Sequence, residues 1–401
     1  MVFPKKKKLN LISFFVVILI VFYIGFWTGE HQVVCKVCPP EEIDFSLFWE
    51  AYHKLQEKFV DKDKFDTQKM IYGAISGMVK SLGDPYTIFL SPEDTKRFKE
   101  DVKGVFEGVG MEIGIRKGQL QVIAPLEGTP AQKAGLLPGD KIIKVDDTLT
   151  ADLTIDEAVN LIRGPKGTEV VLTIYRDSWK EAKEIKIVRG VIEIPSLKWE
   201  ILNSKGEPDP NGDIAYIKLY QFSEKASFDF RKAALKILDS PAKKIILDLR
   251  NNPGGYLEVA QDIAGWFLEK GKVVVIEEFG NGDRNEYKAQ GNGWFSNYKI
   301  VVLINKGSAS GSEILAGALR DNRGILLIGE KSFGKGSVQQ LEELTGGASL
   351  KITIAKWLTP KGELITEKGL DPDIKVEMTS EDYEHDKDPQ LDKAIEIIKD
   401  L

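Results

Sequence analysis

The chain has 401 residues, and its 55 Lys and Arg against 61 Asp and Glu give a net charge of −6. Apolar residues make up 42% and charged residues 29%, which is typical of globular domains rather than of disordered chains. Beyond Lys8 no basic run is present, so a nucleic-acid binder is disfavoured, and two Cys are too few for a disulfide scaffold or a four-Cys zinc site. With only three His, a mechanism that needs a His base or several His ligands is also disfavoured.

The N-terminal segment has the pattern of a membrane anchor. A basic tip, residues 1–8, precedes an apolar run over 9–28 that approaches the hydrocarbon thickness of about 30 Å. No small-residue cleavage site follows the run, which favours an uncleaved single-pass helix over the alternative of a cleaved signal peptide. The lysines indicate a cytoplasmic N-terminus, and everything after about residue 30 is then extracytoplasmic.

Two helices are predicted next, within an N-terminal helical region over residues 40–100. Aromatic and apolar residues recur at i+3 and i+4 spacing from Phe45 to Phe59, and a second helix over 67–82 ends at Gly83. The apolar stripe Phe45–Phe59 suits a homodimer contact, and it suits equally well packing on the chain's own core.

The pattern then changes twice along the chain. Residues 105–190 predict short strands with Gly-rich turns and one helix at 155–163, a compact β module. Within 191–378, strands rich in Val, Ile and Leu alternate with helices, which indicates a buried and largely parallel sheet covered by helices. A tail over 379–401 ends in a short amphipathic helix. The β module is therefore inserted between the N-terminal helices and an α/β core.

The sequence elements are the strands at 214–220, 244–250, 273–279, 299–304 and 324–329, and the helices at 225–239, 256–269, from about 310, and 389–401.

Three segments of the core carry residues suited to chemistry. Asn305–Glu313 follows a strand and opens a helix, where Ser310 would be an exposed nucleophile or only the first residue of a capping box with Glu313. Residues 329–336 nearly spell a phosphate-binding loop, but Gly336 stands where Ser or Thr must bind Mg²⁺. Lys335 is then a turn lysine or a functional amine.

The third segment, Leu247–Gly255, runs from a strand into a Gly-Gly turn. Such a turn presents backbone N–H groups to an anionic atom, or it simply connects a strand to a helix.

The signatures are SASGSEI at 308–314, SFGKGSVQ at 332–339, DLRNNPGG at 248–255, GDPYTIFL at 83–90, TPKGELI at 359–365 and GLDPDIKV at 369–376. Together they resemble the C-terminal processing peptidases, also called tail-specific proteases, over roughly residues 40–380. One departure is Gly311, where Ala is commoner in the family.

This resemblance implies an α/β multidomain protein with a crotonase-like, Clp-protease-like ββα core and an inserted PDZ domain. It implies that Ser310 is the nucleophile, that Lys335 is the general base and that Gln339 orients Lys335. The implied oxyanion hole consists of the backbone N–H of Gly311 with that of Gly254 or Gly255. No cofactor and no metal are implied.

The chemistry agrees with this assignment. A free lysine, with a pKa of about 10.4, is almost wholly protonated at neutral pH and cannot accept a proton from serine. Burial must therefore lower the pKa of Lys335 if it is the base. No His lies near the three segments, and H-E-x-x-H is absent, so a His-dependent hydrolase and a metalloprotease are both disfavoured.

Residues 105–190 resemble a PDZ domain, with TPAQKAGLLPGDKIIKVDD at 129–147 as the typical core segment. The implied ligand is a polypeptide C-terminus with apolar last residues, bound as an added strand. Arg163, at the C-terminus of the helix at 155–163, either bridges this domain and the core or is solvated. The residues at the carboxylate-loop position are Gly108, Val109, Gly110, Met111, Glu112 and Ile113.

The leading hypothesis is a membrane-anchored serine endopeptidase that engages polypeptide C-termini and cleaves through Ser310 and Lys335. A catalytically silent PDZ-containing scaffold is the alternative. A nucleotide-dependent enzyme is a third reading. It is disfavoured because Gly336 stands where Ser or Thr must bind Mg²⁺ and because an exported domain has no nucleotide supply.

Overall fold

The computed structural model describes residues 18–23 and 43–401, apart from residues 117, 127, 152, 154, 194, 380, 383, 384 and 386. It divides into two units, Met1–Ile71 and Tyr72–Leu401. The transmembrane helix predicted over 9–28 lies outside the described residues except for 18–23, which are helical. No helix within the described residues is long and apolar enough to cross a membrane.

The helices predicted near the N-terminus are confirmed as α2 (Ser46–Lys58) and α3 (Thr67–Lys80), with the short helix η1 (Lys62–Lys64) between them. The predicted apolar stripe faces solvent along α2: none of the residues of this helix is buried, and Trp49 is 54% exposed. Its rings contact one another edge to face, as Phe48 does with Trp49 at 5.2 Å between centroids.

The largely parallel sheet of the core is also confirmed. Its six strands lie in the order β10-β11-β12-β15-β16-β19, and only β10 runs antiparallel to its neighbour. The strands are β10 (Leu197–Leu202), β11 (Ile214–Leu219), β12 (Lys244–Asp248), β15 (Lys299–Ile304), β16 (Leu326–Gly329) and β19 (Ile374–Lys375).

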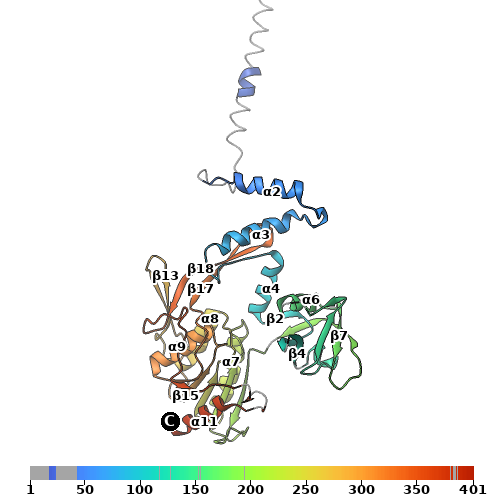
Figure 1. Cartoon of the computed structure of the whole chain (residues 1–401). Helices are drawn as coiled ribbons and strands as arrows, with labels where there is room; N and C mark the ends of the chain where they lie inside the picture. The colour runs from blue at the N-terminus through green and yellow to red at the C-terminus, as the bar shows by residue number, and fades with distance from the viewer. Residues whose placement is uncertain are drawn as a thin grey trace, which may run out of the picture. The chain divides into compact units, whose positions relative to one another are not determined.

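Helices cover both faces of this sheet. Successive side chains of a strand point to opposite faces, and because the central strands carry apolar residues at successive positions, both faces must be covered. Ile245 and Leu247 of β12 pack on the side of α7 (Ala226–Leu238), α8 (Leu257–Phe267) and α9 (Gly311–Arg323), whereas Ile246 packs on the side of α11 (Pro389–Asp400). Figure 1 shows α7, α8 and α9 near one another and α11 beside β15. The continuous Val, Ile and Leu runs thus serve two cores at once.

One predicted strand is not in this sheet. The run at 273–279 forms β13 (Val273–Phe279), which pairs antiparallel with β14 (Arg284–Lys288) and β18 (Ser349–Leu358) in a second sheet. The prediction of a single parallel sheet was wrong for this strand because strand–helix order alone does not say which neighbour supplies the hydrogen bonds. The same sheet contains β17 (Ser337–Glu343) and β1 (Ile88–Leu90), both paired with β18.

The inserted module has its own apolar core beneath a six-stranded antiparallel sheet and the helices α5 (Pro130–Lys133) and α6 (Ile155–Ile162). A two-stranded ribbon of β2 (Val105–Gly108) and β9 (Gly190–Glu193) lies where the chain enters and leaves it. Helix α4 (Pro92–Lys103) precedes β2. The strands are β3 (Met111–Arg116), β4 (Gln119–Pro125), β5 (Lys141–Val145), β6 (Thr148–Leu149), β7 (Glu169–Tyr175) and β8 (Lys183–Val188).

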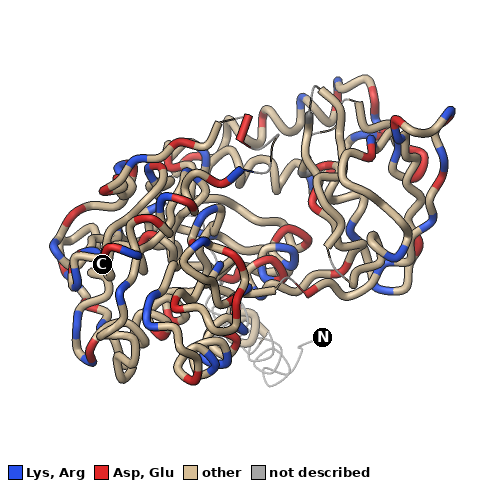
Figure 2. The backbone as a smooth tube through the Cα atoms, turned by 90° about the horizontal axis from the view of Figure 1, so that it is seen from below, with Lys and Arg blue, Asp and Glu red and all other residues tan. Residues whose placement is uncertain are grey.

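Charged residues are interspersed over the described chain. Figure 2 shows Lys and Arg alternating with Asp and Glu along both the core and the inserted module. Many of them form exposed ion pairs, such as Lys225 with Glu193 at 2.7 Å, which contribute little to stability. The fold therefore depends on its apolar cores rather than on its surface charges.

Candidate active site

Ser310 lies on a tight turn between β15 and α9. Its φ of 52° is in the left-handed region, which is uncommon for a residue other than Gly and stores backbone strain. Two buried serines anchor this turn: the Ser308 hydroxyl donates to the Leu249 carbonyl at 2.8 Å, and the Ser312 hydroxyl donates to the Asn252 carbonyl at 2.9 Å. The half-buried Ser310 is thereby presented between two fixed neighbours.

Lys335 lies on the loop that follows β16. The Phe333 N–H donates to the Ser308 carbonyl at 3.0 Å. This loop, residues 330–336 (the lysine loop), is thus bonded directly to the turn of residues 308–312 that carries Ser310 (the serine turn). Gly336 contacts the chain at Thr366 so closely that an added Cβ would lie 2.2 Å from the Thr366 nitrogen. Close packing therefore explains the glycine at this position, where a phosphate-binding loop needs Ser or Thr.

The buried carboxylate of Glu313 joins the serine turn to the lysine loop. One of its oxygens accepts the N–H of Ser310 at 2.9 Å and that of Lys335 at 3.0 Å. The other accepts the Gly334 N–H at 2.7 Å and the Ser332 hydroxyl at 2.6 Å. Burial raises the pKa of Glu313, and the four hydrogen bonds oppose this shift. Three of the four partners are backbone N–H groups, which can only donate, so these contacts favour the ionised form of the carboxyl group.

The side chain of Lys335 is half-buried. Burial lowers the pKa of its amine, and the nearby charge of Glu313 acts in the opposite direction. The side chain expected to orient it, Gln339, instead donates to the carbonyl of Ser337 at 3.0 Å and to the Ser337 hydroxyl. Among the described residues, Gln339 thus has hydrogen bonds to Ser337 rather than to Lys335.

A second lysine, Lys351 on β18, was not found by the sequence reasoning. Burial and the charge of Lys335 lower its pKa to about 8, and Asp84 opposes them. Lys351 pairs in register with Leu341, two residues along β17 from Gln339. Only its place within a strand of mainly apolar residues could have indicated it, and the same strand carries another lysine, Lys356, so the pattern does not single out Lys351.

The sequence left open whether Gly254 or Gly255 contributes its backbone N–H to the oxyanion hole, and the two N–H groups differ in the structure. The Gly254 N–H donates to the Asn252 side chain at 2.9 Å, whereas the Gly255 N–H has no acceptor among the described residues. The strand-like pairing of Gly255 with Phe222 uses the Gly254 carbonyl and the Tyr256 N–H, so the Gly255 N–H points away from Phe222. The described residues leave the Gly311 N–H unpaired as well.

Gly254 packs directly against the serine turn. A Cβ at this position would lie 2.7 Å from the Ser310 Cβ and 2.8 Å from the Gly311 nitrogen, and its φ of 99° is reserved for glycine. The structure therefore brings Ser310, Gly311 and the Gly254-Gly255 turn together.

The inserted module carries a small groove of about 70 Å³ between its carboxylate-loop position and α6. Of the six residues predicted there, Glu112 is exposed and Gly108 is buried beside Arg163, and neither lines the groove. The residues that line it are Val109, Gly110, Met111 and Ile113 with Phe106, Val159, Ile162 and Arg163.

Arg163 has both a stacking and an ionic partner. Its guanidinium lies 4.3 Å from the centroid of the Phe106 ring and 2.7 Å from the Asp101 carboxylate of α4. Arg163 therefore joins the inserted module to the helix that precedes it, a partner that neither the predicted bridge to the core nor a solvated side chain describes.

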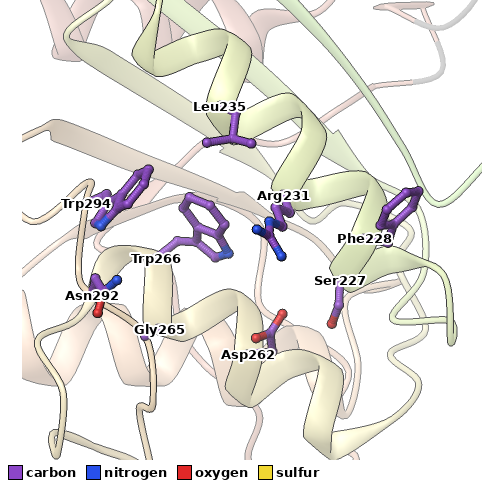
Figure 3. Close-up of a pocket in the computed structure, with 10 residues that line it drawn as sticks. Ser227, Phe228, Arg231, Leu235, Asp262, Gly265, Trp266, Asn292 and Trp294 are labelled. Atoms are coloured by element: carbon purple, nitrogen blue, oxygen red, sulfur yellow. The ribbon is translucent and has the colours of Figure 1, made fainter.

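A larger cavity, of about 440 Å³, lies between α7 and α8 and contains none of the predicted site residues. Figure 3 shows Arg231 of α7 and Asp262 of α8 pointing toward each other, with Trp266 beside Arg231 and Trp294 beyond it. Separately, no group of three or more His, Cys, Asp or Glu suited to a metal ion occurs in the described part of the chain.

Comparison with known proteins gives three family matches. Residues 213–376 match Peptidase family S41, residues 121–176 match a PDZ domain, and residues 35–94 match the N-terminal domain of the activating protease CtpB. The carboxy-terminal processing protease CtpA of Bacillus subtilis is 35% identical over 93% of this chain and 78% of that protein. This chain belongs to the carboxy-terminal processing proteases of family S41.

A second relative and a solved structure support the same family assignment. A carboxy-terminal-processing protease of Bartonella bacilliformis is 39% identical over 82% of this chain and 74% of that protein. The solved structure of a photosystem II D1 C-terminal processing protease aligns with a TM-score of 0.55 and 28% identity, over 82% of this chain and 92% of that one. The chain is thus a serine-type peptidase with a mixed α/β fold and a PDZ domain, and peptides are its substrates.

Substitution of Gly254 tests how tightly the site is packed. In Gly254→Ala we expect kcat for a peptide substrate to fall at least about 100-fold, because the new methyl group displaces Ser310 and the Gly311 nitrogen together, and losing one well-placed backbone donor at such a site costs about that much. Gly280→Ala is the matched control, since its Cβ meets nothing within 4 Å. Equal rates in the two variants would contradict the packing argument.

Proposed function

We propose that this chain is a membrane-anchored endopeptidase that binds polypeptide C-termini in its PDZ groove and hydrolyses peptide bonds with Ser310 as nucleophile and Lys335 as general base. The observation that carries the proposal is the shared carboxylate of Glu313, which accepts the backbone N–H of both residues through one oxygen, at 2.9 Å and 3.0 Å. It keeps the serine turn and the lysine loop at one fixed separation.

In the proposed reaction, the Ser310 hydroxyl gives its proton to the neutral amine of Lys335 as its oxygen attacks the carbonyl carbon of the peptide bond. The N–H groups of Gly311 and Gly255, both without acceptors among the described residues, donate to the oxyanion that forms. The Lys335 ammonium then gives its proton to the leaving amine. Water hydrolyses the remaining ester of Ser310, with Lys335 again accepting a proton.

Gln339 fits this scheme as a residue that orients Lys335 once substrate is bound. Its amide group is held by Ser337, two residues from Lys335, and catalytic hydrogen bonds are often formed only in the substrate complex. The half-burial of Lys335, which lowers its pKa, supports its role as a base.

The PDZ groove supports recognition of a polypeptide C-terminus. Its walls are apolar side chains from β3 and α6, which suit the apolar last residues of a strand-like ligand. Because Arg163 contacts both the groove and Asp101 of α4, ligand binding can be communicated to the helix before the module.

The anchor and the compartment are proposed from the sequence alone. The basic tip at 1–8 and the apolar run at 9–28 favour a single span with a cytoplasmic N-terminus and an extracytoplasmic peptidase. A homodimer through the N-terminal helices is supported by the exposed aromatic stripe of α2, because contiguous exposed apolar side chains mark interaction surfaces.

Removal of the two reacting groups tests the proposal. We expect Ser310→Ala and Lys335→Ala each to abolish degradation of an unfolded protein, while the wild type degrades it with a chelator present and without ATP. Lys331→Ala is the matched control, since this lysine of the same loop has a side chain that is 52% exposed. Cleavage that survives in Ser310→Ala would refute the mechanism. A wild type that binds C-terminal peptides but cleaves none would favour the scaffold.

The pH dependence of kcat/KM tests the base. The rate should rise with pH as Lys335 loses its proton, with a midpoint below the ordinary lysine value because burial lowers this pKa. The charged group that acts on it is Glu313, and the charge of Lys335 in turn lowers the pKa of Lys351. Since the charge of Glu313 raises the pKa of Lys335, Glu313→Gln should move the midpoint to lower pH while kcat falls.

Glu330→Gln is the control for this experiment, because Glu330 is on the same loop and pairs instead with Lys306 at 3.0 Å. Its midpoint should equal that of the wild type. A midpoint that rises in Glu313→Gln would contradict the assignment of Lys335 as the base.

Two substrates that differ only at the C-terminus test the groove. We expect a peptide with a free terminal carboxylate to have a KM roughly tenfold lower than the same peptide ending in a carboxamide, since a charged hydrogen bond contributes about 1.5–3 kcal/mol. Steady-state kinetics on the pair measure this difference. Identical KM values would show that the terminus is not recognised.

A further inference from the structure

The guanidinium group of Arg250 has an acceptor for each of its five N–H donors. Two go to Asp248, from Nε at 3.0 Å and from Nη2 at 2.7 Å. Two go to Asp388, from Nη1 at 2.7 Å and from Nη2 at 2.8 Å. The fifth goes from Nη1 to the side-chain oxygen of Gln390 at 3.1 Å. Arg250 is only 8% exposed, so water does not replace these partners easily.

Three of these five acceptor contacts come from the distant C-terminal helix. Asp388 is the N-cap of α11, and its carboxylate also accepts the Leu391 N–H at 2.9 Å. Gln390 is fully buried and donates to the Val376 carbonyl at 2.7 Å. The first turn of α11 is thus fixed against the end of β12 by polar contacts, while its apolar face packs on the sheet.

The residues that follow Arg250 lead directly to the serine turn. Asn251, with a φ of 58°, exchanges two hydrogen bonds with Asn305, at 2.8 Å and 2.9 Å. The Asn252 carbonyl accepts the Ala309 N–H at 3.0 Å, and the Asn252 side chain accepts the Gly254 N–H at 2.9 Å. A displacement of Arg250 would therefore shift the segment that carries the Gly255 N–H relative to Ser310.

We propose that α11 positions the oxyanion loop: Asp388 and Gln390 hold Arg250, and Arg250 holds residues 251–255 in the arrangement that catalysis needs. This inference rests on the proposed function, because it assigns the Gly255 N–H to the oxyanion. Asp388 and Gln390 are positioning residues, since both act through Arg250. They contribute to transition-state stabilisation without lying at the reacting atoms.

The physical reason is the cost of leaving a buried cation partly unsatisfied. Without Asp388, two N–H donors of Arg250 would lose their charged acceptor, and removing one partner of a buried ion pair is more disruptive than never having built the pair. Arg250 would then turn toward solvent or toward Gln390, and its backbone would move with it. Asp248 cannot compensate, since its other contacts already fix it to the Arg250 N–H and to the Tyr216 hydroxyl.

Asp388→Asn is the informative variant. Asn is as good an N-cap as Asp, so α11 keeps its first turn. Arg250 loses the negative charge of its partner and one of the two oxygen acceptors that Asp388 supplies. We expect kcat to fall at least tenfold and KM to change less than about threefold. Asp392→Asn, an exposed change on the same helix, is the matched control and should leave both unchanged.

Two inhibitors separate positioning from general damage. A peptide aldehyde forms a tetrahedral adduct that needs the oxyanion donors, whereas the matching peptide alcohol binds without them. In Asp388→Asn the inhibition constant of the aldehyde should rise at least tenfold, and that of the alcohol should stay within about threefold. An equal loss for both inhibitors, or an unchanged kcat, would overturn the inference.

Amide hydrogen exchange tests the same contact without any activity. We expect the peptide that covers residues 249–256 to exchange faster in Asp388→Asn than in Asp392→Asn and the wild type. If the wild type neither cleaves peptides nor binds the aldehyde, the proposed function fails, and the exchange measurement still decides whether α11 holds this loop. Identical exchange in all three proteins would overturn the inference by itself.

Discussion

The buried carboxylate of Glu313 is the interaction on which the site depends. A charge removed from water is strongly destabilising unless hydrogen bonds replace its hydration, and here four donors from two chain segments do so. Three of those donors are the backbone N–H groups of Ser310, Gly334 and Lys335, which cannot move unless the chain itself moves. If either segment shifted, donors would be lost and the charge would be left buried. The separation of the serine turn from the lysine loop is therefore fixed by the carboxylate itself.

The parallel sheet explains why these segments meet at all. Parallel strands end at the same edge, and there the register places Asp248 of β12 beside Leu303 of β15, and Ile304 of β15 beside Gly329 of β16. Each strand then leads into one of the three segments that carry polar and glycine residues. This is the edge at which open α/β sheets place their sites. The antiparallel sheet of β17 and β18 adds Gln339 and Lys351, which the parallel topology alone would not supply.

The sequence predicted those parts of the fold that have local signals. Helical periodicity and strand composition are properties of short windows, so α7, α8 and α11 were found nearly at their observed ends, and α9 at its observed beginning. The strand at 273–279 was assigned to the wrong sheet because only one of its partners is near in sequence: β13 pairs with β14, which follows it directly, and with β18, about eighty positions further along the chain. The contact between Arg250 and Asp388 spans 138 positions and leaves no mark in either segment alone.

Within the site, the sequence indicated residue types but not the direction of their groups. Gly254 and Gly255 are equivalent as letters, and it takes the structure to distinguish them, since the Gly254 N–H donates to Asn252 and the Gly255 N–H points away from Phe222. Glu313 was visible as a partner in a capping box, yet three of its four hydrogen bonds come from the loop at 332–335, which no helix-capping rule predicts. Lys351 had no distinctive signal, since its lowered pKa comes from burial and from the charge of Lys335, which lies in a different segment of the chain.

The carboxylate that organises the site also acts on the proposed base, and the two effects oppose each other before proton transfer. Burial favours a neutral Lys335, whereas the charge of Glu313 favours the ammonium form. In the proposed mechanism the lysine becomes an ammonium as the oxyanion forms, so the same negative charge then stabilises the product of proton transfer. Removing the charge would yield more neutral lysine at a given pH and a less favourable transfer from Ser310. A carboxylate at this position is therefore a compromise: it reduces the population of the reactive form and stabilises the state that follows it.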